Sequence, residues 1–178
     1  MPKGDDERIR IEGLNNHADY TVLGNDTTTK ADSTVSILGD AGTISFAKVD
    51  GAANTTVAGI FRTDVAEVVD IGRPSPYSFL EWEIYLSAKT NIASAFIRLG
   101  SDSSNYCEYR YDDSFITAGQ HEIAAVSLSE GLVTGTGMNP QDVKYIAAGF
   151  NFDAETDALA DCRVGNLFLE APVAVRDI

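Results

Sequence analysis

From residue 79 to residue 170 the chain is a series of short segments in which apolar and polar residues alternate, separated at regular intervals by Gly, Asp, Asn and Ser. In residues 79–87, for example, Trp82 falls on one face and Glu81 and Glu83 fall on the other. A period of two residues is that of a β-strand with one buried side, and no stretch longer than a turn keeps helical spacing. The pattern predicts an all-β fold, a jelly-roll-like antiparallel β-sandwich.

The chain has 178 residues, of which 44% are apolar, enough for one substantial core. Its first segment holds few large apolar side chains, so it cannot build a core of its own. A short strand at residues 9–12 is the exception. The sequence therefore predicts an extended N-terminal arm over residues 1–33, a sandwich over residues 34–171 and a short C-terminal tail over residues 172–178.

Alternation and turn residues give the expected elements of the sandwich. Asp-x-Gly spacing between two β-rich runs indicates a hairpin, and a proline after a helix-capping residue indicates one helical turn. The expected strands cover residues 34–38, 43–49, 57–62, 65–71, 79–87, 95–99, 106–111, 124–128, 146–152 and 162–170, with a proline loop at 73–76, a flexible segment at 131–137 and a helical turn at 139–144.

Charge excludes one class of function. The chain has 27 acidic and 13 basic residues, a net charge of −14. This charge repels phosphate backbones and anionic membrane surfaces, so nucleic-acid and membrane partners are not expected. The scarcity of lysine is typical of proteins that stay soluble in strong salt, and a saline source is a hypothesis. Salt should then stabilise the fold by screening repulsion between surface carboxylates.

The first residues are charged where a secretory signal would be apolar, so synthesis in the cytoplasm without a signal peptide is expected. Cys107 and Cys162 are too few for a disulfide framework and are expected as reduced, mostly buried thiols, with a cross-strand disulfide as the alternative. His17 and His121 lie far apart in sequence and no Cys-x-x-Cys occurs. A zinc site is therefore not expected.

Glu81 and Glu83 project from one face of a strand, as the carboxylates of jelly-roll glycosidases do. A retaining glycosidase needs two carboxyl groups about 5 Å apart, one of them with a raised pKa. Nothing near this pair in the sequence provides an environment that would raise a pKa. We interpret the two as part of a solvated strand face, and no catalytic residue is assigned.

Tyrosines at alternate positions have two readings. They could form a platform on which sugar rings stack, because a tyrosine has an apolar body and a polar tip. Tyrosines with a period of two are more often half-buried pairs between strands. The four concerned are Tyr85, Tyr106, Tyr109 and Tyr111.

Two groups of oxygen-bearing residues could bind calcium, the hard cation that such ligands suit. Neither group has the spacing of a known calcium loop, and Asp and Asn are also common turn residues because they bond their own backbone. We interpret both as turns and assign no metal or cofactor. The groups are Asp102, Asn105, Asp112 and Asp113, and Asp153, Glu155, Asp157 and Asp161. Residues 131–137 are rich in glycine but lack the lysine of a phosphate-binding loop.

Five segments of the sequence are informative together: the hairpin 39–46, the strand 79–86, the segment 98–106, the turn 139–146 and the closing segment 163–168. Together they resemble the jelly-roll sandwiches of phage and archaeal-virus virion proteins, which are related in fold to carbohydrate-binding modules. The resemblance covers about four fifths of the chain and does not bring any catalytic residue with it. It implies a structural or adhesive role on a virus particle.

The leading hypothesis from the sequence is a non-enzymatic capsid decoration protein located in the virion. It would bind other virion proteins, namely the major capsid protein or tail components, through its arm and its sandwich surface, and it would form a homo-oligomer, with a trimer favoured. The alternative is a carbohydrate-binding module or receptor-binding adhesin of a tail fibre or spike, which would bind a glycan through exposed aromatic residues.

Overall fold

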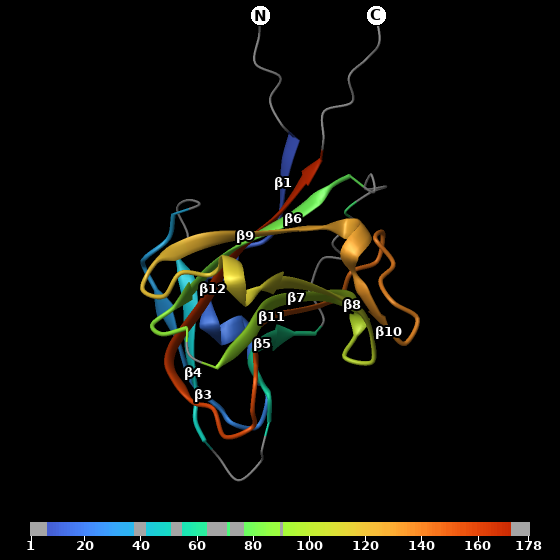
Figure 1. Ribbon diagram of the computed structural model, residues 1–178. Helices are drawn as coiled ribbons and strands as arrows, with labels where there is room; N and C mark the ends of the chain where they lie inside the picture. Colours follow the sequence, from blue (N-terminus) through green and yellow to red (C-terminus); the bar gives the residue numbers. More distant parts are fainter. Residues whose placement is uncertain are drawn as a thin grey trace, which may run out of the picture.

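The computed structural model describes residues 7–37, 42–50, 55–63, 71, 77–89 and 91–171. Strands dominate this part of the chain and form two antiparallel sheets packed face to face (Figure 1). The predicted all-β, jelly-roll-like antiparallel β-sandwich is confirmed. Three short 3-10 helices lie between strands: η1 (His17–Asp19), η2 (Asp113–Phe115) and η3 (Leu128–Glu130).

Sheet A has the strand order β3-β4-β12-β6-β9, with β1 beside β12. Strand β12 is long enough to pair with β4 over its first half and with β1 over its second, and a bulge near Asn166 bends it between the two. Asn166 has a positive φ of 43°, which asparagine tolerates better than most residues. The strands are β1 (Glu7–Glu12), β3 (Thr27–Ser33), β4 (Thr43–Lys48), β6 (Phe79–Leu86), β9 (His121–Ser127) and β12 (Leu159–Ala171).

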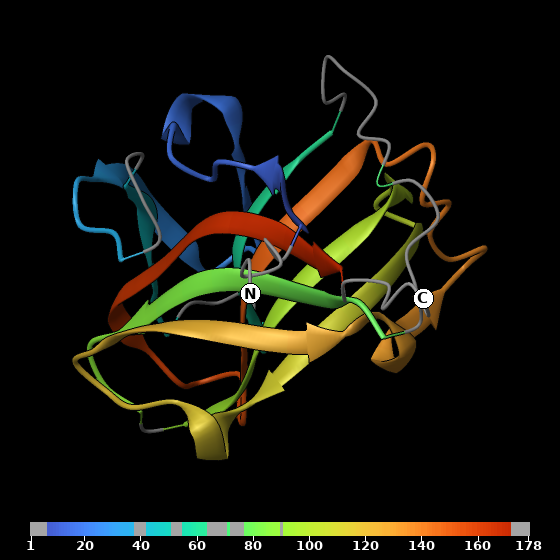
Figure 2. The same cartoon turned by 90° about the horizontal axis from the view of Figure 1, so that it is seen from above.

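Sheet B has the strand order β10-β8-β7-β11-β5-β2. Its centre is formed by β7, β11 and β5, which pair over most of their lengths. Seen from above, β12, β6 and β9 lie side by side in front of the strands of sheet B (Figure 2). The strands are β2 (Thr21–Leu23), β5 (Val57–Arg62), β7 (Ile92–Asp102), β8 (Asn105–Asp112), β10 (Leu132–Thr134) and β11 (Tyr145–Phe152).

The core lies between the sheets and follows from the alternation in the sequence. Trp82 of β6 is fully buried, as its position on the apolar face predicts. Phe46 of sheet A meets Phe150 of sheet B with ring centroids 6.2 Å apart. On strands such as β6 and β7, alternate side chains thus pack against the opposite sheet, and the others lie on the outer faces of the sandwich.

The N-terminal segment differs from its expectation. Residues 7–33 were expected to form an extended arm, but β1 and β3 belong to sheet A and β2 belongs to sheet B. Their few apolar side chains are sufficient because other strands supply the rest of the core: Leu14 and Tyr20 are buried in it. Residues 1–6 of the expected arm and the tail at 172–178 lie outside the described residues.

Two smaller expectations are corrected. The segment 139–144 forms a turn closed by a hydrogen bond from Asp142 N to Asn139 O (3.0 Å), and it is not a helix. Residues 34–37 are not a strand, because they leave the sheet and lie across its outer face, where Ser36 and Ile37 bond to Glu83. The proline loop at 73–76 and most of the expected strand at 65–71 lie outside the described residues.

Candidate functional site

The outer face of sheet B carries a cluster of aromatic rings. On β7 the residues Ala95, Ile97 and Leu99 point into the core, so Phe96 and Arg98 point outward. Neighbouring strands place further rings on the same side. We call this set the aromatic face: Phe61 of β5, Phe96 and Arg98 of β7, Tyr106 of β8 and Tyr145 of β11.

The strand register brings these rings together. Gly100 lies between Tyr106 and Tyr145 in one row across three strands, and the two rings meet above it with centroids 5.9 Å apart. A Cβ on Gly100 would lie 2.0 Å from Asn105 O and 2.6 Å from Tyr106 Cα, so no larger residue fits there. Tyr145 also meets Phe61, with centroids 6.1 Å apart. A glycine therefore allows three aromatic rings from three strands to form a continuous surface.

Arg98 is fixed in this surface. Its guanidinium carbon lies 4.6 Å from the centroid of Phe96 and 5.0 Å from that of Tyr106, which is within the range of a cation–π contact. Its Nε donates to Oε2 of Glu108 at 2.6 Å. Burial disfavours the charge on Arg98, but the carboxylate of Glu108 outweighs burial, and the pKa of the guanidinium rises above its ordinary value. The arginine therefore stays charged and immobile.

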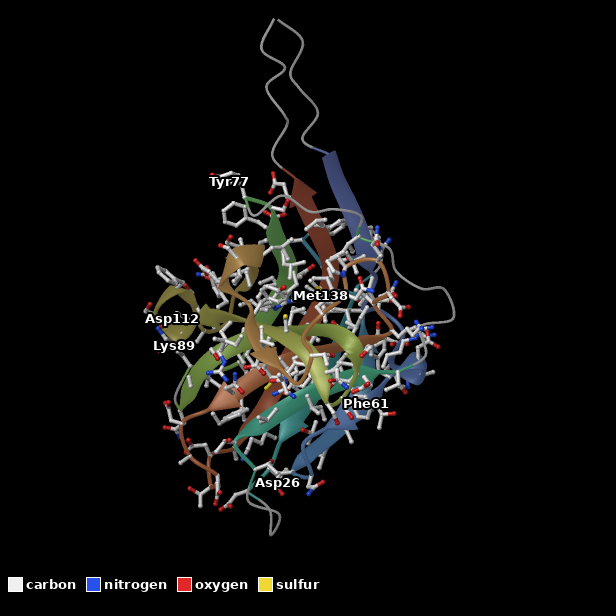
Figure 3. All side chains as sticks on the ribbon, turned by 90° about the vertical axis from the view of Figure 1, so that its right-hand side faces the viewer. Asp26, Phe61, Tyr77, Lys89, Asp112 and Met138 are labelled. Carbon is white, nitrogen blue, oxygen red and sulfur yellow. The ribbon has the colours of Figure 1, made fainter. Side chains whose placement is uncertain are left out.

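The aromatic face has a closed floor and a more accessible rim. Phe96 and Tyr145 are almost fully buried, Phe61 and Tyr106 are half-buried, and the side chain of Arg98 is 14% exposed. Figure 3 labels Phe61 on β5 and Asp112 at the end of β8, well separated in that view. Rigid half-exposed rings next to a fixed guanidinium can stack against a sugar ring and hydrogen-bond to its oxygens.

A polar pair continues the face beyond the rings. Asn151 of β11 donates from Nδ2 to Ser94 Oγ of β7 at 2.9 Å, and the two residues are direct neighbours in the register. The amide oxygen and the hydroxyl point to the same side of the sheet as Phe96, two residues along the strand from Ser94. This side of the sheet therefore combines an apolar floor with hydrogen-bonding groups at one end.

The four tyrosines expected from the sequence do not form one platform. Tyr106 is on the aromatic face, but Tyr109 and Tyr111 point the other way, into the core. Tyr111 packs edge-on against Trp82 with centroids 6.5 Å apart. Tyr85 lies on the outer face of sheet A, between Arg163 and His121. The packing interpretation is thus correct for Tyr109 and Tyr111.

The interpretation of Glu81 and Glu83 as a solvated face is wrong for Glu83, which has no exposed surface. Its two carboxylate oxygens accept hydrogen bonds from Ser36 Oγ (2.7 Å), Ile37 N (2.9 Å) and Asn166 Nδ2 (3.1 Å). His121 Nδ1 lies 2.9 Å from Oε1. The carboxylate holds loop 34–37 on the outer face of sheet A.

The first acidic group serves turns; in the second, Asp157 accepts from Ala154 N at 2.8 Å, whereas Asp161 lies in β12 and binds Arg163. Hydrogen bonds from Asn105 and from the backbone of Ser104 close the turn at Asp102 and lower the pKa of its carboxyl group. Asp112 caps η2 by accepting from Ser114 N at 2.9 Å. Within the described ranges, no three His, Cys, Asp or Glu side chains are arranged to hold a metal ion.

The loop that contains the second acidic group is fastened by a buried lysine. Lys48 of β4 is 1% exposed, and its Nζ donates to the carbonyl oxygens of Glu155 (2.7 Å) and Asp157 (2.6 Å). The same ammonium lies 5.2 Å from the centroid of the Phe152 ring. A positive charge from the protein itself therefore holds this loop.

Both cysteines are free thiols, Cys162 buried and Cys107 half-buried, as expected. Burial raises the pKa of the Cys162 thiol, so it stays protonated. The histidines are on separate surfaces, His17 beside Asp32 and His121 beside Glu83. None of the helices in the described ranges is long and apolar enough to cross a membrane.

Sequence reasoning missed Phe61, Phe96, Arg98 and Tyr145. A signal was present on β7, where Phe96 and Arg98 alternate with inward apolar residues, so an aromatic residue had to lie on an outer face. Arg98 and Glu108 also occupy outward positions on adjacent strands, but they face each other only because of the register between β7 and β8.

Comparisons with known proteins agree on the fold. The chain is similar to the family 11 carbohydrate-binding module of the cellulase Lic26A-Cel5E of Clostridium thermocellum, with a TM-score of 0.57, 8% identity and coverage of 95% of this chain and 99% of that one. It is also similar to the family 30 carbohydrate-binding module of the cellulase Cel9D-Cel44B of the same organism, with a TM-score of 0.55, 12% identity and coverage of 93% and 98%.

A third similar structure is an exo-β-agarase, with a TM-score of 0.58 and 10% identity. The match covers 92% of this chain but spans a quarter (25%) of the agarase chain. No protein-family model matches the sequence. No curated protein matches it either. At these identities the likeness establishes a β-sandwich fold of the type found in carbohydrate-binding modules.

Proposed function

We propose that this protein is a non-catalytic carbohydrate-binding domain that holds a glycan on the aromatic face of sheet B. The observation that carries the proposal is the combination of half-buried rings from separate strands, Phe61 and Tyr106, with a guanidinium held against the Tyr106 ring, Arg98. Such a surface offers stacking area at little cost in conformational entropy, because the rings and the guanidinium are already held in place by the sheet.

The fold supports the proposal. The similar modules of families 11 and 30 are named as carbohydrate-binding modules, and one of the similar structures in family 11 is a complex with a β-1,3-1,4-linked tetrasaccharide. Because this fold hosts many functions, the surface chemistry has to decide.

The role as a capsid decoration protein is less well supported. It depended on an N-terminal arm that would reach a neighbouring subunit, but residues 7–33 pair within the two sheets. The virion location, the virion-protein partners and the homo-oligomer stay predictions from the sequence.

A glycan array followed by calorimetry on the purified chain tests the proposal. We expect binding to at least one oligosaccharide class, and a loss of roughly two- to tenfold in affinity for Tyr106→Ala and for Phe61→Ala, since an aromatic contact contributes roughly 0.5–1.5 kcal/mol beyond its buried area. Tyr85→Ala is the matched control, because Tyr85 is also half-buried and stacks on an arginine but lies on the opposite sheet. Silence on the array, or equal losses in all three variants, would contradict the proposal.

A further inference from the structure

Glu108, beside the aromatic face and between Arg98 and Arg110, is too deeply buried to accept a hydrogen bond from a ligand. Its side chain is 5% exposed, and each carboxylate oxygen is already engaged: Oε2 accepts from Arg98 Nε at 2.6 Å, and Oε1 accepts from Arg110 Nε. A sugar hydroxyl that approaches this point as a donor finds both oxygens occupied and buried.

Arg110 has the opposite character. Its side chain is 54% exposed. Its Nε is bonded to Glu108, but its terminal Nη1 and Nη2 have no hydrogen bond or ion pair to another residue in the described part of the chain. The contact with Glu108 holds the guanidinium in place while leaving the outer donors of its fork free. Such a fork matches the two oxygens of a carboxylate or of a sulfate.

The local charge agrees with this geometry. Two arginines share one carboxylate, so this group of three residues has one positive charge in excess, although the chain carries −14. Asp112, the next outward residue on β8, has its Oδ1 engaged by Ser114 N at 2.9 Å at the start of η2. Asp112 is itself exposed, so the guanidinium donors of Arg110 lie two residues from one exposed carboxylate on the outer face of sheet B.

From the exposed guanidinium of Arg110, held through Nε by Glu108 with its terminal donors unoccupied by other described residues, we infer that the face selects glycans carrying an anionic group, a uronate carboxylate or a sulfate, and that Arg110 binds that group. The inference rests on the proposed function and specifies its substrate class. The aromatic rings would contact the sugar body, as they would for a neutral glycan. The anionic substituent would add a charge-assisted, two-point hydrogen bond at the exposed edge of the face.

The net negative charge of the rest of the chain means that the preference for anionic glycans acts only at short range. At low ionic strength the charge of −14 repels any anionic ligand before it reaches the face. At about 0.15 M salt the Debye length is roughly 8 Å, so distant carboxylates are screened while a direct contact with Arg110 persists. The test belongs at that ionic strength.

Calorimetry with matched oligosaccharides tests the inference on the full chain. Each set contains a neutral oligosaccharide, its uronate-bearing form and its sulfated form on the same backbone. We expect the uronate or the sulfated member to bind about tenfold or more tightly than the neutral one, because hydrogen bonds between two charged groups are stronger than those between neutral groups. Arg110→Gln should remove this preference and keep the binding of the neutral member, and Arg110→Lys should keep part of the preference.

Arg163→Gln is the matched control. Arg163 also bonds a carboxylate two residues away, Asp161, but it lies on sheet A, so the variant makes the same change of net charge on the other face. Neutral members that bind as tightly as the charged ones, or a preference that survives Arg110→Gln, overturn the inference and leave the proposed function standing. Absence of binding to all members of every set overturns both.

Discussion

The imidazole of His121 lies against the carboxylate of Glu83, with Nδ1 2.9 Å from Oε1, on the outer face of a sheet where the sequence alone suggested two solvated glutamates. Glu83 is fully buried because loop 34–37 covers it, and three other groups donate to its oxygens. The four partners of this carboxylate come from a loop and from two other strands. Glu83 therefore connects its own strand to three other parts of the fold.

Glu83→Gln should therefore destabilise the fold. A glutamine can accept at one oxygen, but its amide group would face two of the present donors, and buried donors without a partner cost roughly 1–3 kcal/mol each. We expect a loss of about 2–4 kcal/mol in the free energy of unfolding, measured by urea denaturation. Glu81→Gln, on the same face of the same strand, is the control. Equal losses in the free energy of unfolding of the two variants would show that the burial of Glu83 does not contribute to stability.

Lys48→Met should also destabilise the protein. The substitution keeps most of the side-chain volume but leaves the carbonyl oxygens of Glu155 and Asp157 without the donor that now serves both. We expect a loss of about 2 kcal/mol or more in urea denaturation and faster amide exchange in the 153–158 loop. Lys144→Met is the control, because Lys144 is 44% exposed and pairs with Asp142 at the surface. An unchanged exchange pattern in the loop would contradict the assigned role of Lys48.

The protein should lose stability at alkaline pH. Burial raises the pKa of Tyr109, with a further contribution from Cys107, and burial together with the carboxylate of Glu12 raises the pKa of Tyr20. A folded-state pKa above the ordinary value of 10.0 means that the fold retains a proton that the unfolded chain releases. The stability from each tyrosine is therefore complete below pH 10 and falls by up to about 1.4 kcal/mol per pH unit above it.

Tyr109→Phe should flatten this alkaline decline, because phenylalanine has no proton to release. Urea denaturation between about pH 8 and about pH 11 gives the slope for both proteins. Tyr77→Phe, at a position that is 75% exposed, is the control and should leave the slope unchanged. A slope identical in Tyr109→Phe and in the unmodified chain would refute the assignment of Tyr109 to this decline.

Salt should raise the temperature of unfolding. The chain carries 27 acidic and 13 basic residues, so repulsion between surface carboxylates opposes the compact state at low ionic strength. The Debye length falls from roughly 30 Å at 0.01 M to roughly 3 Å at 1 M, which removes most of this repulsion. Calorimetry across this range should show a steady increase, and an unfolding temperature indifferent to NaCl would also remove the basis for a saline source.

The alternation of side chains was sufficient to predict the sandwich and much of its core. Trp82 is buried where the pattern of β6 places it, and β5 and β8 match their expected ranges within a residue. The prediction of an extended arm is wrong, because a segment with few apolar residues can still add strands to a sheet whose core is supplied by other strands. Strand pairing with distant segments, such as Ile9 with Leu169, gives such segments a place in a sheet.

The candidate site was predicted only in part. Tyr106 was named from its position in an alternating strand, but nothing in the sequence indicated that Tyr145, some forty residues later, would meet it. The two rings meet because β8, β7 and β11 pair in a register that puts Gly100 between them. A shift of one residue in either pairing would turn one of the strands over and separate the rings.

The amino-acid sequence by itself determined the kind of element, the inward or outward parity of most strand residues, and the net charge, because these depend on local spacing and composition. The tertiary structure decided which outward residues become neighbours and which become buried. Glu83, Arg98 and Arg110 acquire their roles from residues on other strands or from a covering loop, and the register and the path of the chain that create those contacts are set by the packing of the whole sandwich.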